Sequence, residues 1–232
     1  MTAPYNNTGL IGGLIPSVKR KAFFSFHFDD IMRVNVVRNA WKGIRPDSTS
    51  MRSFYDSSLW ESRKAEGEDA IKKLIRDGVN YTSAVCVLVG TETWLRRWVK
   101  YEIARGVIDG RGLLALHINN IRHHQTLGVH PLGINPFDGL GVGKVQESVF
   151  NTPRYYLFER TAVRNTAGGF DWSWPRYKDY TDPVKLPTWL SDPAPGYVTP
   201  LSTNVDVYDY TTQEGHKNLG AWIDRAAQRS GR

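Results

Sequence analysis

Ala84-Val-Cys-Val-Leu-Val-Gly90 is a short, continuously apolar run that is rich in valine. Such a run is typical of a strand that is covered on both faces in a parallel sheet. Thr93-Trp-Leu-Arg-Arg-Trp-Val-Lys-Tyr-Glu-Ile103 follows it, and from Trp98 to about Gly110 apolar residues recur at helical spacing. This order predicts a strand followed directly by an amphipathic helix, as in an α/β fold.

The same alternation continues on both sides of this unit. Ala22 to Phe28 alternates aromatic and polar residues in the manner of a strand, and Gly112 to Ile118 is a further apolar strand. Helical spacing marks Ile31 to Trp41 and Gly67 to Gly78, and Ser53-Phe-Tyr-Asp56 could form a short second strand. We therefore expect a flavodoxin-like α/β fold with a mostly parallel sheet and helices on both faces.

The pattern loosens beyond residue 119. Residues 120–215 are rich in glycine, proline, asparagine and aromatic residues, with a possible strand at Tyr155 to Phe158. A helix with one apolar face is predicted over Asn218 to Ala227. We expect a leader over residues 1–20, a domain over 21–145 and an irregular extension over 146–232 that packs on the domain.

Composition and charge limit the class of protein. With 41% hydrophobic and 23% charged residues the chain is globular, and its formal charge of +7 suits an anionic partner. No block of Lys or Arg dominates, so we expect no nucleic-acid and no membrane partner. The start of the chain lacks the features of a secretion signal, and the single Cys86 cannot form an internal disulfide. Both observations favour the cytoplasm.

Two familiar site motifs are not satisfied. Gly139-Leu-Gly-Val-Gly-Lys144 departs from the phosphate-loop pattern at Asp138 and Val145, so we interpret it as a turn. The histidines, His123-His124 included, lack metal-ligand spacing, which predicts no metal site.

Trp98 and Glu102 are four residues apart and therefore lie on one face of the predicted helix. Glu102 falls at the edge of the buried stripe, close to the carboxyl end of a strand, where ligands bind in open α/β sheets. A carboxylate at that place is a candidate catalytic residue. The ordinary alternative is an ion pair with Arg105, one turn further along the helix.

In their order and spacing these residues resemble a TIR domain. The resemblance rests on Phe23-Phe-Ser-Phe26 as first strand, Ser83 to Gly90 as central strand and Trp98-x-x-x-Glu102 on the next helix. The longer strings are similar to the TIR-like (ThsB) proteins of the bacterial Thoeris antiphage system; they are Phe23 to Trp41, Thr91 to Ile103 and Leu113 to Ile118.

The resemblance implies cleavage of the nicotinamide–ribose bond of NAD+, with Glu102 as the catalytic residue. NAD+ would be a substrate, with no bound cofactor. The product would be an ADP-ribose derivative, expected in cyclic form, that activates a separate antiphage effector. A phage protein could trigger the enzyme.

The resemblance also places further residues at the substrate. Ser25, Phe26 and His27 occupy the strand end that faces the ligand cleft in TIR enzymes. Independently of the resemblance, Asp29 and Asp30 follow the first strand. We expect one of them to cap the following helix, and its partner, Asp30 among the candidates, could orient a substrate or a nearby arginine.

Charge and position suggest three more substrate contacts on the helices. Arg33 and Lys100 are candidate phosphate contacts by charge alone, and both could instead be solvated. Trp98 could shape the pocket or simply pack beneath it.

Two other functions remain open. A TIR adaptor would act by self-association and recruitment, without catalysis, and a homo-oligomer would fit it. A nucleic-acid-associated protein would need aromatic and basic residues on one exposed sheet face, whereas these strands are expected to be buried on both sides.

Overall fold

The computed structural model describes residues 20–44, 65–146, 148, 152–166 and 168–232 of the 232-residue chain. The stretch that could form a second strand, Ser53 to Asp56, lies outside these residues.

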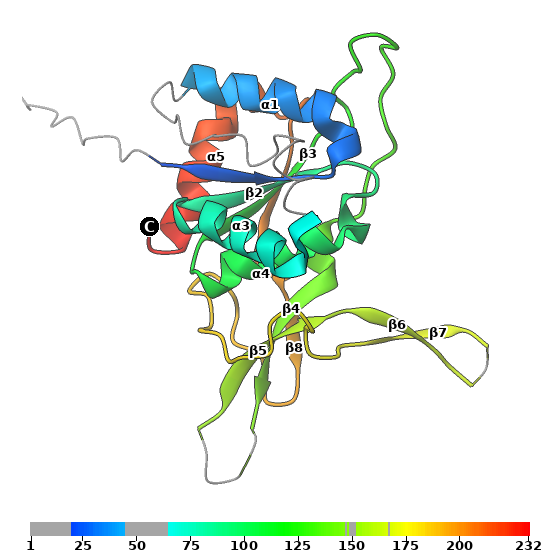
Figure 1. The fold of residues 1–232 in the computed structure, drawn as a ribbon, viewed down its shortest axis with the longest axis vertical. Coiled ribbons are helices and arrows are strands. Elements are labelled where there is room, and N and C mark those ends of the chain that lie inside the picture. The colour runs from blue at the N-terminus through cyan, green and yellow to red at the C-terminus, as the bar shows by residue number, and fades with distance from the viewer. Residues whose placement is uncertain (1–19, 45–64, 147, 149–151, 167) are drawn as a thin grey trace, which may run out of the picture.

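Four parallel strands form the main sheet, in the order β1-β2-β3-β9 (Figure 1). They are β1 (Ala22–Ser25), β2 (Ala84–Val89), β3 (Gly112–His117) and β9 (Asp206–Asp209). All six residues of β2 are buried, because the strand lies between two neighbours and under helices on both faces. The predicted α/β fold with a parallel sheet is confirmed.

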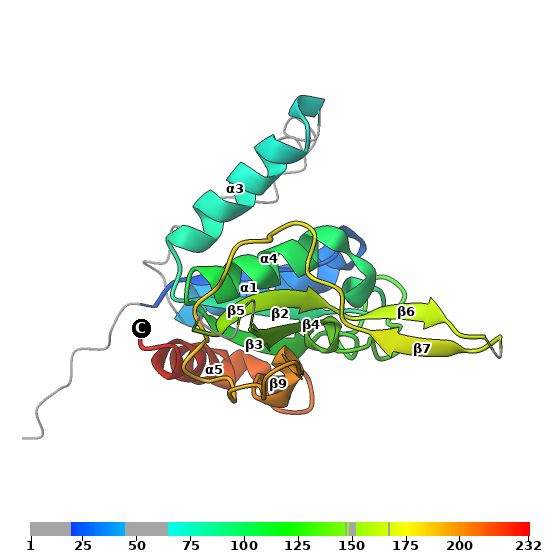
Figure 2. The ribbon, with the colours of Figure 1, turned by 90° about the horizontal axis from the view of Figure 1, so that it is seen from below.

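Helices cover both faces of this sheet (Figures 1 and 2). On one face lie α1 (Ile31–Ile44) and α5 (Gly215–Arg229), which also contact each other. On the other face lies α4 (Arg97–Ile108), and α3 (Glu68–Asn80) packs against α4 and projects beyond the sheet. None of the helices in the described residues is long and apolar enough to cross a membrane.

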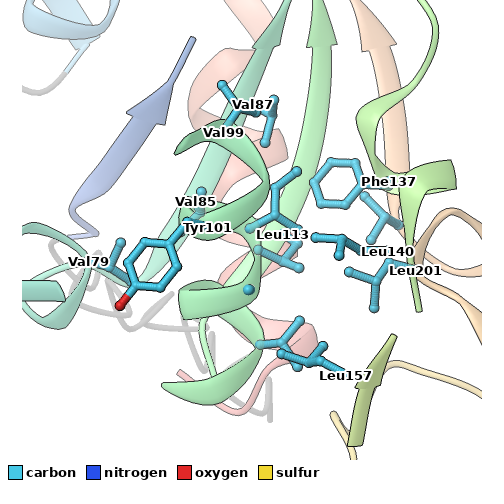
Figure 3. Close-up of a cluster of buried hydrophobic side chains, with 14 of the residues drawn as sticks. Val79, Val85, Val87, Val99, Tyr101, Leu113, Phe137, Leu140, Leu157 and Leu201 are labelled. Atoms are coloured by element: carbon cyan, nitrogen blue, oxygen red, sulfur yellow. The ribbon is translucent and has the colours of Figure 1, made fainter. Parts of the chain in front are cut away.

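Successive residues of each strand enter two different hydrophobic cores, because side chains alternate between the faces of a sheet. Val85 and Val87 of β2 belong to the core beneath α4, whereas Cys86 and Leu88 belong to the core beneath α1 and α5. The first core also contains side chains from beyond residue 136, in the same cluster as Val99 of α4 (Figure 3). These are Phe137, Leu140, Leu157 and Leu201.

The first strand is shorter than predicted. It ends at Ser25, and the chain then turns into a 3-10 helix over Phe28–Asp30 that leads directly into α1. The turn carries Asp30 inward against the end of β2, so residues 26–28 cannot continue along the neighbouring strand.

The residues after 146, here called the C-terminal extension, are more regular than the sequence indicated. Tyr155 to Phe158 forms a strand as predicted, within β5 (Arg154–Glu159), which pairs with β4 (Leu140–Val145). On its other side β4 pairs with β8 (Val198–Pro200), so the three strands make an antiparallel sheet. A hairpin of β6 (Thr161–Arg164) and β7 (Phe170–Ser173) projects from this sheet (Figures 1 and 2).

The interpretation of the glycine-rich run at residues 139–144 as a turn is wrong. Most of it is strand β4, and the glycines permit close packing with its neighbours. A Cβ on Gly141 would lie 2.5 Å from Val198, and one on Gly143 would lie 2.5 Å from Phe158.

Ion pairs connect α3, α4 and the C-terminal extension. Asp179 accepts hydrogen bonds from Arg97 at 3.1 and 2.8 Å, and the Lys72 ammonium lies 2.9 Å from it. Arg97 also pairs with Glu68 of α3 at 2.5 and 2.7 Å. The bond from Arg97 lowers the pKa of the Asp179 carboxyl from its usual 3.8 to about 2, with a further contribution from Lys72.

This lowered pKa predicts how Asp179 contributes to acid stability. Because the folded-state pKa lies below the unfolded-state value, the contribution is complete above about pH 4 and is lost as the pH falls through about 2. The shift corresponds to about 2 kcal/mol of unfolding free energy. In urea titrations we expect Asp179→Asn to be less stable than wild type at pH 7 and the difference to shrink toward pH 2. A difference that stays constant over that range would contradict the prediction.

Candidate active site

Glu102 of α4 is the centre of the candidate site. Its neighbours Val99 and Ile103 pack into the core, and Glu102 itself is only 1% exposed. The Ser25 hydroxyl, on the last residue of β1, donates a hydrogen bond to the Glu102 carboxylate. A buried carboxylate is costly unless it is hydrogen-bonded, so Ser25 stabilises an otherwise unfavourable group at the carboxyl end of a strand.

The alternative role proposed for Glu102 used Arg105 as its partner. In the structure Arg105 instead forms an ion pair with Asp109, which is one turn further along α4. Both side chains are nearly buried there, close to the end of the helix. Arg105 is therefore paired with Asp109 at the end of α4.

The alternation of β1 decides which of its residues can face Glu102. Ser25 points toward α4, and Phe24 and Phe26 belong to the core on the other face, beneath α1. Phe26 is 5% exposed in that core, so the structure does not bring it together with Glu102. His27 is half-buried beyond the strand end, with its Nε2 3.8 Å from the Asp29 carboxylate.

Asp30 lies at the start of α1, beside the end of β2. Its carboxylate occupies the space that a side chain on Gly90 would need, and it is 4% exposed. His130 Nδ1 is 3.7 Å from Asp30 Oδ1. Burial raises the pKa of the Asp30 carboxyl, and the nearby His130 and His27 oppose that shift in part. Asp30 thus sits at the carboxyl ends of β1 and β2, but on the α1 side of the sheet.

His130 is a residue of this region that the sequence analysis missed. It belongs to the loop that follows β3, and its backbone N–H donates to the Asn119 carbonyl at 3.0 Å. The same loop passes so close to β2 that a Cβ on Gly133 would overlap the Gly90 carbonyl. No spacing pattern marks a lone histidine in such a loop, because its position depends on how the loop folds back.

The two predicted phosphate contacts are occupied by protein groups. Arg33 is 3% exposed, and it donates to the carbonyls of Ile121 at 2.9 Å and Gly128 at 3.3 Å. Lys100 pairs with Glu159 of β5 at 2.7 Å. Residues two apart on a helix are about 200° apart around its axis, so Lys100 lies on the other side of α4 from Glu102. Contact of either residue with substrate stays a prediction.

Trp98 is partly buried and packs against the core beneath α4. Its ring meets Tyr101 edge to face, with centroids 6.1 Å apart, and the Arg97 guanidinium lies 5.0 Å from its centroid. These contacts agree with the packing alternative for Trp98. Within the described residues, no group of three or more His, Cys, Asp or Glu side chains is placed to hold a metal ion.

Ser25→Ala tests the contact that holds Glu102. Removing the hydroxyl leaves the buried carboxylate with one hydrogen bond fewer, which costs about 1–3 kcal/mol. If Glu102 acts on a substrate, we expect turnover to fall about tenfold. Ser25→Thr, which keeps the hydroxyl, is the matched variant and should retain more activity. Equal turnover in wild type and Ser25→Ala would show that this bond does not matter for the site.

The comparisons with known proteins identify the family of the chain. Residues 23–123 match the family described as Thoeris protein ThsB, TIR-like domain. A protein of Bacillus cereus (strain MSX-D12), named "Putative cyclic ADP-D-ribose synthase ThsB1", is 34% identical over 207 residues, which cover 88% of this chain and 99% of that protein. The α/β fold, with its parallel sheet and helices on both faces, is that of a TIR-like protein. The chain belongs to the ThsB family of the Thoeris system.

Proposed function

We propose that this protein is a TIR enzyme that consumes NAD+ and converts it to a cyclic ADP-ribose-type nucleotide. The observation that carries the proposal is the buried Glu102 carboxylate, which Ser25 holds at the carboxyl end of β1. The name of the Bacillus cereus relative, a cyclic ADP-D-ribose synthase, supports the same chemistry.

The proposed reaction breaks the bond between nicotinamide and ribose. Nicotinamide leaves with the bonding electron pair, and positive charge develops on the ribose. A carboxylate that is already fixed in place can stabilise such an oxocarbenium-like state without reorganising. Attack by a hydroxyl of the same molecule closes a ring and releases a proton, whereas attack by water gives linear ADP-ribose.

The proposal extends to the biological role. The cyclic nucleotide would activate a separate Thoeris effector in the cytoplasm. A phage protein would be the trigger, and self-association could accompany activation. A non-catalytic adaptor is the alternative.

Mass spectrometry of the nucleotide product tests the proposal. Purified protein is incubated with NAD+, alone and with lysate from phage-infected cells. We expect free nicotinamide and a nucleotide that is lighter than ADP-ribose by one water. Linear ADP-ribose alone would contradict the cyclisation. The absence of nicotinamide in both incubations, and of any new nucleotide in phage-challenged cells, would contradict the enzyme and leave the adaptor.

A further inference from the structure

Two acidic residues of the C-terminal extension pair with the first turn of α4, the helix that carries Glu102. Asp179 pairs with Arg97, which is the first residue of the helix, and Glu159 pairs with Lys100 one turn later. Glu102 follows these two basic residues by five and two positions. The acids come from different parts of the extension, since Glu159 ends β5 and Asp179 lies beyond the β6–β7 hairpin.

Both contacts are partly shielded from solvent, and the Arg97 side chain is 37% exposed. The Asp179 side chain is 4% exposed, and its two oxygens accept from Nε and from a terminal nitrogen of Arg97, which is a bidentate arrangement. The Lys100 and Glu159 side chains are 21% and 19% exposed, with 2.7 Å between Nζ and Oε1. Such charge-assisted and bidentate pairs fix orientation more strongly than single surface contacts.

The packing beneath this turn is incomplete. A cavity of about 120 Å³ lies between α4 and the extension, and the residues just named line it together with Leu95, Tyr177 and Lys178. Tyr177 is 1% exposed, and among the described residues its hydroxyl has no hydrogen-bond partner. Charged pairs therefore bridge the side of this turn that faces the extension, whereas Val99 packs on the side that faces the sheet.

We propose that Asp179 and Glu159 are positioning residues, which hold the first turn of α4 so that the Glu102 carboxylate stays in place beside Ser25. This inference rests on the proposed function of Glu102. A displacement of about 1 Å at a catalytic group can reduce turnover about 100-fold, so the loss of a remote anchor has a measurable effect. The extension is therefore part of the catalytic apparatus, although its two acids are not catalytic residues.

Charge exchange provides the sharpest test. Lys100→Glu places two carboxylates together, and Lys100→Glu combined with Glu159→Lys restores an ion pair of reversed polarity. We expect kcat to fall at least about tenfold in the single variant and to return to within about threefold of wild type in the double variant, with KM for NAD+ little changed. Asp179→Asn should lower kcat in the same way.

Asp192→Asn is the matched control. It removes the charge from the 2.6 Å pair between Asp192 of the extension and Lys144 of β4. Neither residue lies on α4, so kcat should stay at the wild-type value. Amide hydrogen exchange reports on α4 independently of catalysis. Exchange at residues 97–102 should rise in Asp179→Asn and not in Asp192→Asn.

Three results would overturn the inference. The first is a wild-type kcat in both Asp179→Asn and Lys100→Glu. The second is a kcat in the double variant that is no higher than in Lys100→Glu. The third is unchanged amide hydrogen exchange at residues 97–102 in Asp179→Asn. Failure of rescue would favour a direct contact of Lys100 with substrate. If wild type cleaves no NAD+ while the exchange results are as expected, then the proposed function fails and the structural anchoring of α4 stands.

Discussion

Glu102→Gln is expected to abolish NAD+ cleavage almost completely. The amide has nearly the shape of the carboxylate and can still accept the hydrogen bond from Ser25, but it carries no negative charge. Loss of a fixed charge that stabilises the transition state should lower kcat by about 10³-fold, equivalent to roughly 4 kcal/mol. The effect is measured as the rate of nicotinamide release at saturating NAD+, with nicotinamide quantified by liquid chromatography.

Glu92→Gln is the control for this experiment. Glu92 is an exposed residue just before α4 and pairs with Arg96, so its loss should leave turnover unchanged. Folding of the Glu102→Gln protein should be intact, because a buried neutral amide avoids the cost of a buried charge. A Glu102→Gln enzyme with more than about a tenth of wild-type kcat would show that another group supplies the catalytic charge.

Gly112→Ala is expected to give a large loss of stability. Gly112 begins β3, directly beneath α5, and a Cβ there would overlap the Ala226 carbonyl and lie 2.7 Å from the Ala227 nitrogen. Backbone atoms within a helix cannot rotate away as a side chain can, so α5 must shift from the sheet. We expect a loss of about 3 kcal/mol, which is at the upper end for overpacking. The melting temperature should fall by roughly 10 °C.

Gly139→Ala is the matched substitution, since a Cβ at Gly139 would meet no atom within 4 Å and the residue has ordinary backbone angles. Its melting temperature should be close to that of wild type. Calorimetry or circular dichroism measures the melting temperatures of the two variants. Equal melting temperatures for Gly112→Ala and Gly139→Ala would mean that α5 moves on β3 at little cost.

The sequence predicted the parts of the fold whose side chains are buried on both faces. Residues 84–89 and 113–116 are continuously apolar because helices cover both sides of β2 and β3. Strand β9 escaped detection because Asp206-Val-Tyr-Asp209 is short, lies at the sheet edge and is only partly buried. Strand β4 was not predicted because its glycines are typical of turns. Only the tertiary structure shows that they allow neighbouring chains to pack closely.

The sequence predicted the candidate site residues whose type and spacing both indicate a site. It was less informative for residues whose role depends on the direction of the side chain. Glu102 and Ser25 were each expected near the carboxyl end of a strand, and a hydrogen bond joins them. Phe26 lies on the opposite face of the sheet from Glu102, because Ser25 points toward α4 and the next residue points the other way. The sequence did not show which of the two faces Ser25 would take. The charge of Arg33 or Lys100 does not reveal its partner, since long side chains can reach backbone carbonyls or a carboxylate as readily as a phosphate.

The position of β9 along the chain has a consequence for biosynthesis. Its neighbour β3 is complete at His117, but Asp206 leaves the ribosome only after the 88 residues between them, 118–205, have been translated. Until then the backbone groups of residues 114–117 form an open edge, and such edges invite pairing with other chains. We therefore expect nascent or truncated chains that lack residues 206–209 to aggregate or to require chaperones, and closure of the sheet to be a late, slow step in folding.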